Sequence, residues 1–115
     1  MAIDVLQALD VIEVMENYLQ RIRPPEEIRA KLDIAYKIEG QSIIVFEIRP
    51  HWKNPNEMAE FPVAKTTFVK TNNHWKVFWM KSDLKWHAYS PKSIVKSIKE
   101  FTQLIEEDKY HCFWG

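Results

Sequence analysis

Cysteine and glycine are scarce in this sequence, and neither sign of charge prevails over the whole chain. Its 115 residues include one cysteine, Cys112, and two glycines, and lysine plus arginine balance the acids at a net charge of zero. A single thiol cannot form an intramolecular disulfide, and it offers no second sulfur to a metal. The sequence therefore indicates a reducing compartment, and we expect a cytoplasmic protein.

Long apolar runs are also missing. Asp4, Asp10 and Glu13 interrupt the apolar residues near the N-terminus, which argues against a signal peptide. No stretch approaches the roughly 20 apolar residues of a membrane helix, so no membrane association is expected. Hydrophobic residues at 46% and charged residues at 28% are typical of globular proteins. We expect one soluble domain spanning residues 1–115.

The balanced total conceals a strong charge polarity along the chain. Residues 62–99 contain eight lysines and one acid, a charge of +7, whereas residues 1–61 carry −4 and residues 100–115 carry −3. Aromatic residues interrupt these lysines, and a basic surface that carries rings is one way in which proteins hold nucleic acid. The segment predicts an anionic ligand, a nucleic acid or a protein as partner.

An amphipathic helix is predicted at the N-terminus. Asp4 and Gln7 resemble a capping box at its start, and Pro24 and Pro25 end it near Arg23. Pro25 can then start a short helical turn that stops near Leu32. The apolar residues that recur at helical spacing, and that we expect to be buried, are Val5, Leu9, Ile12, Met15, Leu19 and Ile22.

The middle of the chain predicts strands joined by turns. Residues 34–38 and 43–48 flank the turn Gly40-Gln41-Ser42, and residues 63–71 and 75–80 form a second pair, with a short extended piece at 86–89. Ser90 and Pro91 then open a final helix, whose apolar residues are Ile94, Ile98, Phe101 and Ile105.

This order of elements predicts an α+β fold. Its sheet is a four- to five-stranded antiparallel meander, and the N-terminal and C-terminal helices pack on one face. Residues 77–80 are apolar on both faces of their strand, so the second face also needs a cover. We expect either the C-terminal segment or a second subunit there, with Phe78, Phe113 and Trp114 as interface residues of a homodimer.

Several blocks of sequence resemble a known bacterial family. They include Arg23-Pro24-Pro25, residues 46–50, Asp83-Leu84-Lys85-Trp86-His87 and the closing Cys112-Phe113-Trp114-Gly115. From the first proline pair to the last residue, the chain resembles the domain of unknown function 3024 family. Since that family has no assigned activity, cofactor or substrate, the resemblance implies a compact bacterial domain and supplies no site residues.

One candidate binding site combines charges from neighbouring strands. If the helices cover Ile44, Phe46 and Ile48, then Glu47 and Arg49 point away from them, and Lys65 can join that side. Charged groups beside a partly covered apolar surface suit an anionic ligand. The alternative is ordinary cross-strand salt bridging on a solvated face.

Two further candidates lie in the basic segment. Lys92, Lys96 and Lys99 form a stripe if the final helix begins at Ser90, although surface charges of this kind are usually solvated or paired with acids such as Glu13 and Glu16. In Lys85-Trp86-His87, Trp86 is the best candidate for an exposed ring, whereas alternation assigns Trp75, Val77 and Trp79 to the core.

Catalysis is the competing interpretation. Asp33, Glu47 and Arg49 resemble the acidic pair and basic residue of a metal-dependent nuclease, but arginine cannot act as a base. The histidines lack a metal-ligand spacing, so neither a metal nor a cofactor is predicted. The sequence thus favours a non-enzymatic binding module, with a metal-dependent enzyme and a structural homodimer as alternatives.

Overall fold

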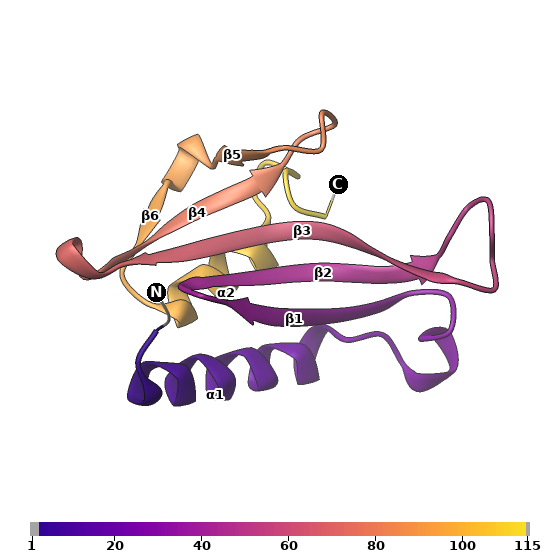
Figure 1. Ribbon diagram of the computed structural model, residues 1–115, viewed down its shortest axis with the longest axis horizontal. Helices are drawn as coiled ribbons and strands as arrows, with labels where there is room; N and C mark the ends of the chain where they lie inside the picture. The colour runs from indigo at the N-terminus through magenta and orange to yellow at the C-terminus, as the bar shows by residue number, and fades with distance from the viewer. Residues whose placement is uncertain (1–2, 115) are drawn as a thin grey trace.

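The computed structural model, in which residues 3–114 are described, combines two helices with one antiparallel sheet (Figure 1). The helices are α1 (Val5–Ile22) and α2 (Ile98–Glu107). The strands are β1 (Asp33–Glu39), β2 (Ser42–Pro50), β3 (Met58–Val69), β4 (His74–Met80), β5 (Trp86–Ala88) and β6 (Ile94–Val95). The sheet order is β1-β2-β3-β4-β5, and β6 pairs with β4 beside β5. The predicted α+β meander is confirmed.

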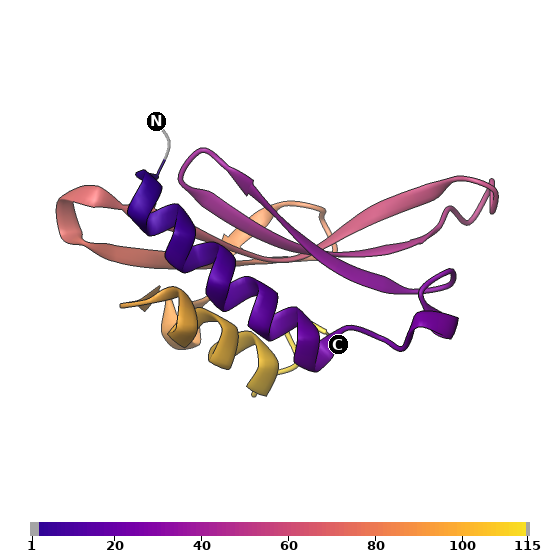
Figure 2. The same cartoon turned by 90° about the horizontal axis from the view of Figure 1, so that it is seen from below.

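Both helices lie on the same side of the sheet, as Figure 2 shows and as the sequence predicts. The core lies between them and the strands. It is built from apolar residues of every strand except β5, from both helices and from the C-terminal segment, with Val11, Met15, Tyr18, Ile43, Val45, Ala64, Trp75, Val77, Val95, Ile98, Phe101, Ile105 and Phe113 among its buried members.

Helix α1 starts and stops as predicted, but of the predicted stripe only Met15, Leu19 and Ile22 pack against the core. Asp4 caps it by accepting a hydrogen bond from the Gln7 N–H at 2.8 Å, and the chain leaves the helix at Arg23 before the proline pair. Val11, Met15 and Tyr18 are its fully buried residues. The prediction was wrong for Val5 (76% exposed), Leu9 (59%) and Ile12 (41%) in the first half of the helix, where Leu6 (80%) is exposed as well. Two overlapping stripes at helical spacing exist in α1, and contact with both the sheet and α2 selects the one containing Tyr18.

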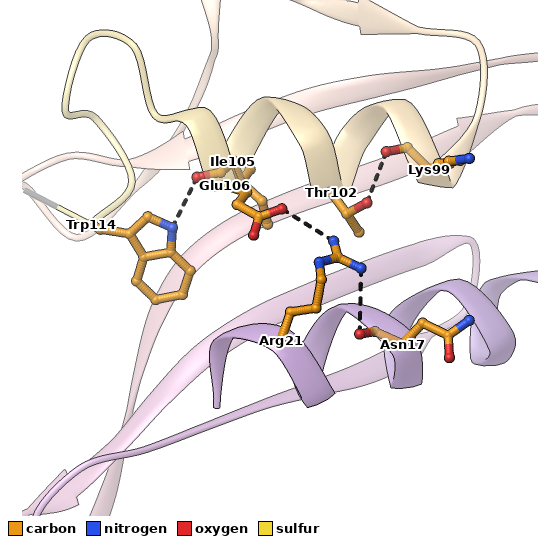
Figure 3. Close-up of polar contacts among 7 residues, drawn as sticks. All are labelled: Asn17, Arg21, Lys99, Thr102, Ile105, Glu106 and Trp114. Atoms are coloured by element: carbon orange, nitrogen blue, oxygen red, sulfur yellow. Dashed lines mark hydrogen bonds and ion pairs between the residues drawn. The ribbon is translucent and has the colours of Figure 1, made fainter. Parts of the chain in front are cut away.

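One polar contact crosses the seam between α1 and α2, and others lie beside it (Figure 3). Arg21 donates one hydrogen bond to the Glu106 carboxylate at 3.1 Å and another to the Asn17 carbonyl at 3.5 Å. At the end of α2, the Trp114 indole donates to the Ile105 carbonyl at 2.9 Å. The seam therefore joins the two ends of the chain.

The final helix begins later than the sequence predicts. Ser90 and Pro91 belong to a single 3-10 turn, Ile94 and Val95 form β6, and the helix starts at Ile98. Ser97 caps it by accepting a hydrogen bond from the Glu100 N–H at 3.1 Å. The expected helical position of Ile94 was wrong because Val95 reaches the core through a strand paired with Trp75.

The C-terminal segment turns back on the helix side of the sheet. Asp108 ends α2 in the left-handed region, with φ at 41°, and its buried carboxylate accepts the N–H groups of Phe113 at 3.0 Å and Trp114 at 2.9 Å. The Phe113 ring then packs 4.8 Å from the ring of Tyr89. Phe113 and Trp114 therefore extend the core under the helices and do not cover the second face of the sheet.

Replacing Asp108 by Ala should destabilise the fold strongly. The change removes two hydrogen bonds to a charged acceptor and leaves two partly or fully buried N–H groups without a partner, a loss of about 2–4 kcal/mol. Asp108→Asn keeps one carbonyl oxygen and tolerance of positive φ, so it should lose roughly half as much. Urea denaturation followed by far-UV circular dichroism measures both values, and an Ala variant within about 0.5 kcal/mol of the unmodified protein would contradict this role.

Candidate functional site

The register of the central strands assigns each side chain to a face. Ile43, Thr66 and Val77 lie side by side on β2, β3 and β4 and belong to the side that the helices cover. One residue along, Ile44, Lys65 and Phe78 are partners and point to the other side. Among the elements of residues 3–114, no helix lies over that second side (Figure 2). We call it the open face and define it by Ile44, Phe46, Lys65, Phe78 and Trp86.

Lys65 occupies the middle of the open face. Its ammonium nitrogen lies 4.9 Å from the centre of the Phe78 ring and 5.1 Å from the centre of the Trp86 ring. Such cation–π contacts contribute about 0.5–2 kcal/mol, more as the cation loses water. Partial burial lowers the pKa of Lys65, and only the distant charge of Glu39 opposes this shift. Lys65 is thus a cation held between two rings.

Lys37 gives a useful contrast at the other end of the open face. Its ammonium lies 5.2 Å from the centre of the Phe46 ring, but it also contacts the carboxylates of Glu60 at 2.9 Å and Glu39 at 3.6 Å. These acids raise the pKa of Lys37, with the Glu60 hydrogen bond as the main cause. Within the described part of the chain, no carboxylate lies within 4.0 Å of Lys65. Lys37 is therefore paired with acids, whereas Lys65 is not.

A shallow pocket adjoins the Phe78 ring. It has a volume of about 250 Å³ and is lined by β4, β5 and the start of β6, including Lys76, Phe78, Ala88 and Ile94. Lys76 shares the face of Phe78 by alternation along β4 and is exposed. The site therefore combines flat apolar surface with two lysines, which suits a ligand that has both rings and negative charge.

The predicted group of Glu47, Arg49 and Lys65 does not form. Glu47 lies opposite Phe61 and contacts the Arg49 side chain at 3.6 Å, while the Arg49 guanidinium stacks 4.2 Å from the Phe61 ring. Alternation along β2 places Glu47 on the side of Val45, whereas Lys65 is the partner of Ile44. The helices cover the side of Ile43 and Val45, so Glu47 and Arg49 lie on the helix side of the sheet and Lys65 lies on the open face.

The predicted lysine stripe is also absent, because α2 does not begin until Ile98. Lys92 lies in the 3-10 turn and contacts Glu100 at 3.5 Å, and Lys96 lies between β6 and α2. Lys99 alone belongs to the helix, where it lines the groove between α1 and α2 together with Glu13. The three lysines thus lie in three different local structures.

Of Lys85, Trp86 and His87, only Trp86 reaches the open face. His87 is the partner of Trp79 and therefore points to the helix side, where its ring nitrogen lies 2.8 Å from the Asp83 carboxylate. That contact is the first cause of the lowered pKa of Asp83. Lys85 is exposed in the turn before Trp86, with its N–H bonded to Asp83 at 2.9 Å.

The two acids of the nuclease alternative belong to separate ion pairs. The Asp33 carboxylate accepts two hydrogen bonds from Arg23, both at 2.8 Å, and these are the main cause of its lowered pKa. Glu47 contacts Arg49 instead. Between residues 3 and 114, no group of three or more His, Cys, Asp or Glu side chains is arranged to hold a metal ion. The geometry does not support the acidic pair on which the nuclease interpretation depends.

The sequence did not identify Trp52 as an exposed aromatic residue. Trp52 is 78% exposed in the loop that joins β2 to β3, at the end of the arm that extends beyond β1 and β4 in Figure 1. Its ring stacks on His51 at 6.0 Å, and the Lys53 ammonium lies 5.0 Å from its centre. Alternation of apolar and polar residues along strands does not predict the exposure of a ring in a loop. The signal that the sequence offered was the position of Trp52 between Pro50 and Pro55.

Comparison with known proteins gives a family but no activity. Within the described residues, neither helix is long and apolar enough to cross a membrane. No curated protein and no solved structure matches the chain significantly. Residues 4–115 match the family described as "Domain of unknown function (DUF3024)", which covers nearly the whole chain and confirms the resemblance found in the sequence. The chain therefore belongs to the DUF3024 family.

Proposed function

We propose that this protein is a non-enzymatic binding module that holds single-stranded nucleic acid on its open face. The observation that carries the proposal is Lys65, a partly buried cation between the Phe78 and Trp86 rings without a counter-ion. Burial of a charge is costly unless an opposite charge accompanies it. A bound phosphate would supply that charge.

The surroundings of Lys65 favour nucleic acid over a simple anion. Bases stack on aromatic side chains of exposed sheets, while lysines beside them contact the phosphates, and this mode needs no fixed base sequence. Phe78 and Trp86 supply the rings, Lys76 lies on the same face, and Lys85 is adjacent in sequence to Trp86. Of the residues predicted from sequence, Lys65, Phe78 and Trp86 thus belong to the proposed site. A bacterial, cytoplasmic protein is part of the same proposal, in keeping with its single thiol.

A second copy of the chain is the competing occupant of the open face. Ile44 is 9% exposed and Phe46 is 6% exposed although no helix covers them, and Phe78 beside them is half-buried. Apolar sheet faces of this kind form the centres of homodimers. The two occupants differ in what they demand of Lys65, since a homodimer would bring two uncompensated lysines towards each other.

Nucleic acid binding is tested with fluorescently labelled single-stranded DNA and RNA by fluorescence anisotropy. Lys65→Glu should weaken binding about tenfold or more, and the affinity of the unmodified protein should fall steeply between about 50 and about 200 mM salt. Lys109→Glu is the matched control, because Lys109 also lies over a ring, that of Tyr110 at 5.7 Å, but in the C-terminal segment on the helix side. Equal losses for the two variants, or no binding by the unmodified protein, would reject the proposed function.

Titration of Lys65 provides an independent test. Because burial lowers its pKa, Lys65 should lose its proton at lower pH than the exposed lysines, and a bound phosphate should move its pKa upward. Affinity for the oligonucleotide should accordingly decline as the pH rises through the pKa of free Lys65. NMR of ¹³Cε-labelled lysine, assigned with a Lys65→Arg variant, measures both values. A Lys65 signal that titrates with the other lysines would contradict the environment described above.

The homodimer makes its own prediction. If the open face is a self-interface, Phe78→Asp should turn a dimer into a monomer, because it places two charges in an apolar contact. Sedimentation equilibrium of the unmodified protein and the variant decides this. A monomer in both cases removes the homodimer interpretation, whereas a dimer that Phe78→Asp dissociates and single-stranded DNA leaves intact would replace the nucleic acid proposal.

A further inference from the structure

The first half of α1 exposes an apolar surface that the core does not use. Val5, Leu6, Leu9 and Ile12, here called the exposed stripe, account for four of the large hydrophobic side chains that face solvent. Three of them are more than half exposed, although core packing would bury such residues. Contiguous apolar surface of this kind on a helix marks a binding site for another molecule. Figure 2 shows no other described element passing over the outer side of α1.

The exposed stripe continues into a groove. Leu19, further along α1, lines a groove of about 530 Å³ together with Ile34 and Tyr36 of β1. The Tyr36 hydroxyl reaches the Glu16 carboxylate at 3.3 Å, which shows that this side of α1 faces β1. Leu9, Ile12 and Leu19 recur at the spacing of one helix face, and Glu16 lies between Ile12 and Leu19 on that same face. An opposing helix with apolar residues at steps of three and four would match it.

The charges beside the exposed stripe all have one sign. Each of Leu6, Leu9 and Ile12 is followed four residues later by an acid, namely Asp10, Glu13 and Glu16. Residues four apart are neighbours on a helix surface, so each of these three apolar side chains has a carboxylate next to it. Residues 3–20 contain no lysine or arginine. The exposed stripe is therefore apolar and acidic, whereas the groove beyond it also contains Arg23 and Arg29.

The apolar and acidic character of the exposed stripe indicates which kind of partner can bind it. Two copies of α1 would bring six of these acids together, which disfavours self-association. A membrane surface carries anionic lipid and attracts helices with lysine and arginine on the polar face, so acids beside the apolar residues disfavour it too. A helix that presents leucine-like residues along one stripe and lysine or arginine beside it satisfies both the apolar and the acidic part of the surface.

We propose that the exposed stripe of α1 docks a basic amphipathic helix of a partner protein. This surface contains none of the open-face residues, so it constitutes a second binding site beside the proposed nucleic acid site. The docked helix would place its apolar residues over Leu6, Leu9 and Ile12 and its cations next to Asp10 and Glu13.

The test uses two designed peptides of about 14 residues, or four helical turns, with fluorescein labels. Both carry leucines at steps of three and four, and one has lysine and the other glutamate at the flanking positions. The lysine peptide should bind the full chain one to one, with the glutamate peptide at least about tenfold weaker, as measured by anisotropy. Leu6→Ser with Leu9→Ser should weaken the lysine peptide by about tenfold. Because both leucines are exposed, thermal unfolding of this variant should match that of the unmodified protein.

Charge reversal makes the test specific. Asp10→Lys with Glu13→Lys should turn the preference toward the glutamate peptide, and Lys65→Glu on the open face should leave lysine-peptide binding unchanged. Binding that survives Leu6→Ser with Leu9→Ser, or a preference that charge reversal does not alter, would overturn the proposal. Two further results would overturn it: dimerisation of the protein in sedimentation, or co-sedimentation of the protein with phosphatidylglycerol vesicles. Either result counts if Leu6→Ser with Leu9→Ser abolishes it, because the occupant of the stripe would then be a second copy or a membrane.

Discussion

The register in which β2, β3 and β4 pair is the constraint on which the rest of this structure depends. It aligns Ile43 with Thr66 and Val77 under the helices, and a slip of one residue would exchange the two faces. The core would then receive Lys65 in place of Thr66. The buried Thr66 hydroxyl instead donates to the Lys76 carbonyl at 2.8 Å, so the one polar member of this row has a partner. Lys65 is consequently a surface cation, and the chemistry of the open face follows from the same register.

Local signals in the sequence were sufficient for the elements but not for the choice of face. The Asp4 cap, the proline pair and the turn at Gly40 are each read from a few adjacent residues, and the structure has all three. Residues 43–46 are all apolar and all buried, so alternation in β2 carries no information about which side the helices take. That choice depends on packing with α1 and α2, which no local pattern describes. The expected group of Glu47, Arg49 and Lys65 failed for this reason.

The same limit applies to the two ends of the chain. Helical spacing in α1 fits two overlapping stripes, and only contact with α2 shows that Tyr18 is inside and Leu9 outside. Near the other end, Ile94 fits a helical pattern, but Val95 pairs with Trp75 and the strand prevails over the helix. The lysines of the basic segment consequently fall on strands, turns and one helix. Their shared sign is a property of the sequence, whereas their grouping is set by the fold.

The contact between Arg21 and Glu106 joins residues 85 positions apart, and it has a consequence for how the protein is made. Sheet strands that are neighbours in sequence can pair as soon as they leave the ribosome, since a meander requires only short loops to close. Helix α1 emerges first, yet the side that packs on α2 stays uncovered until nearly the whole chain has been synthesised. During that interval both the α2-facing side of α1 and its exposed stripe are in contact with water. Helix α1 is thus the last of these elements to complete its packing.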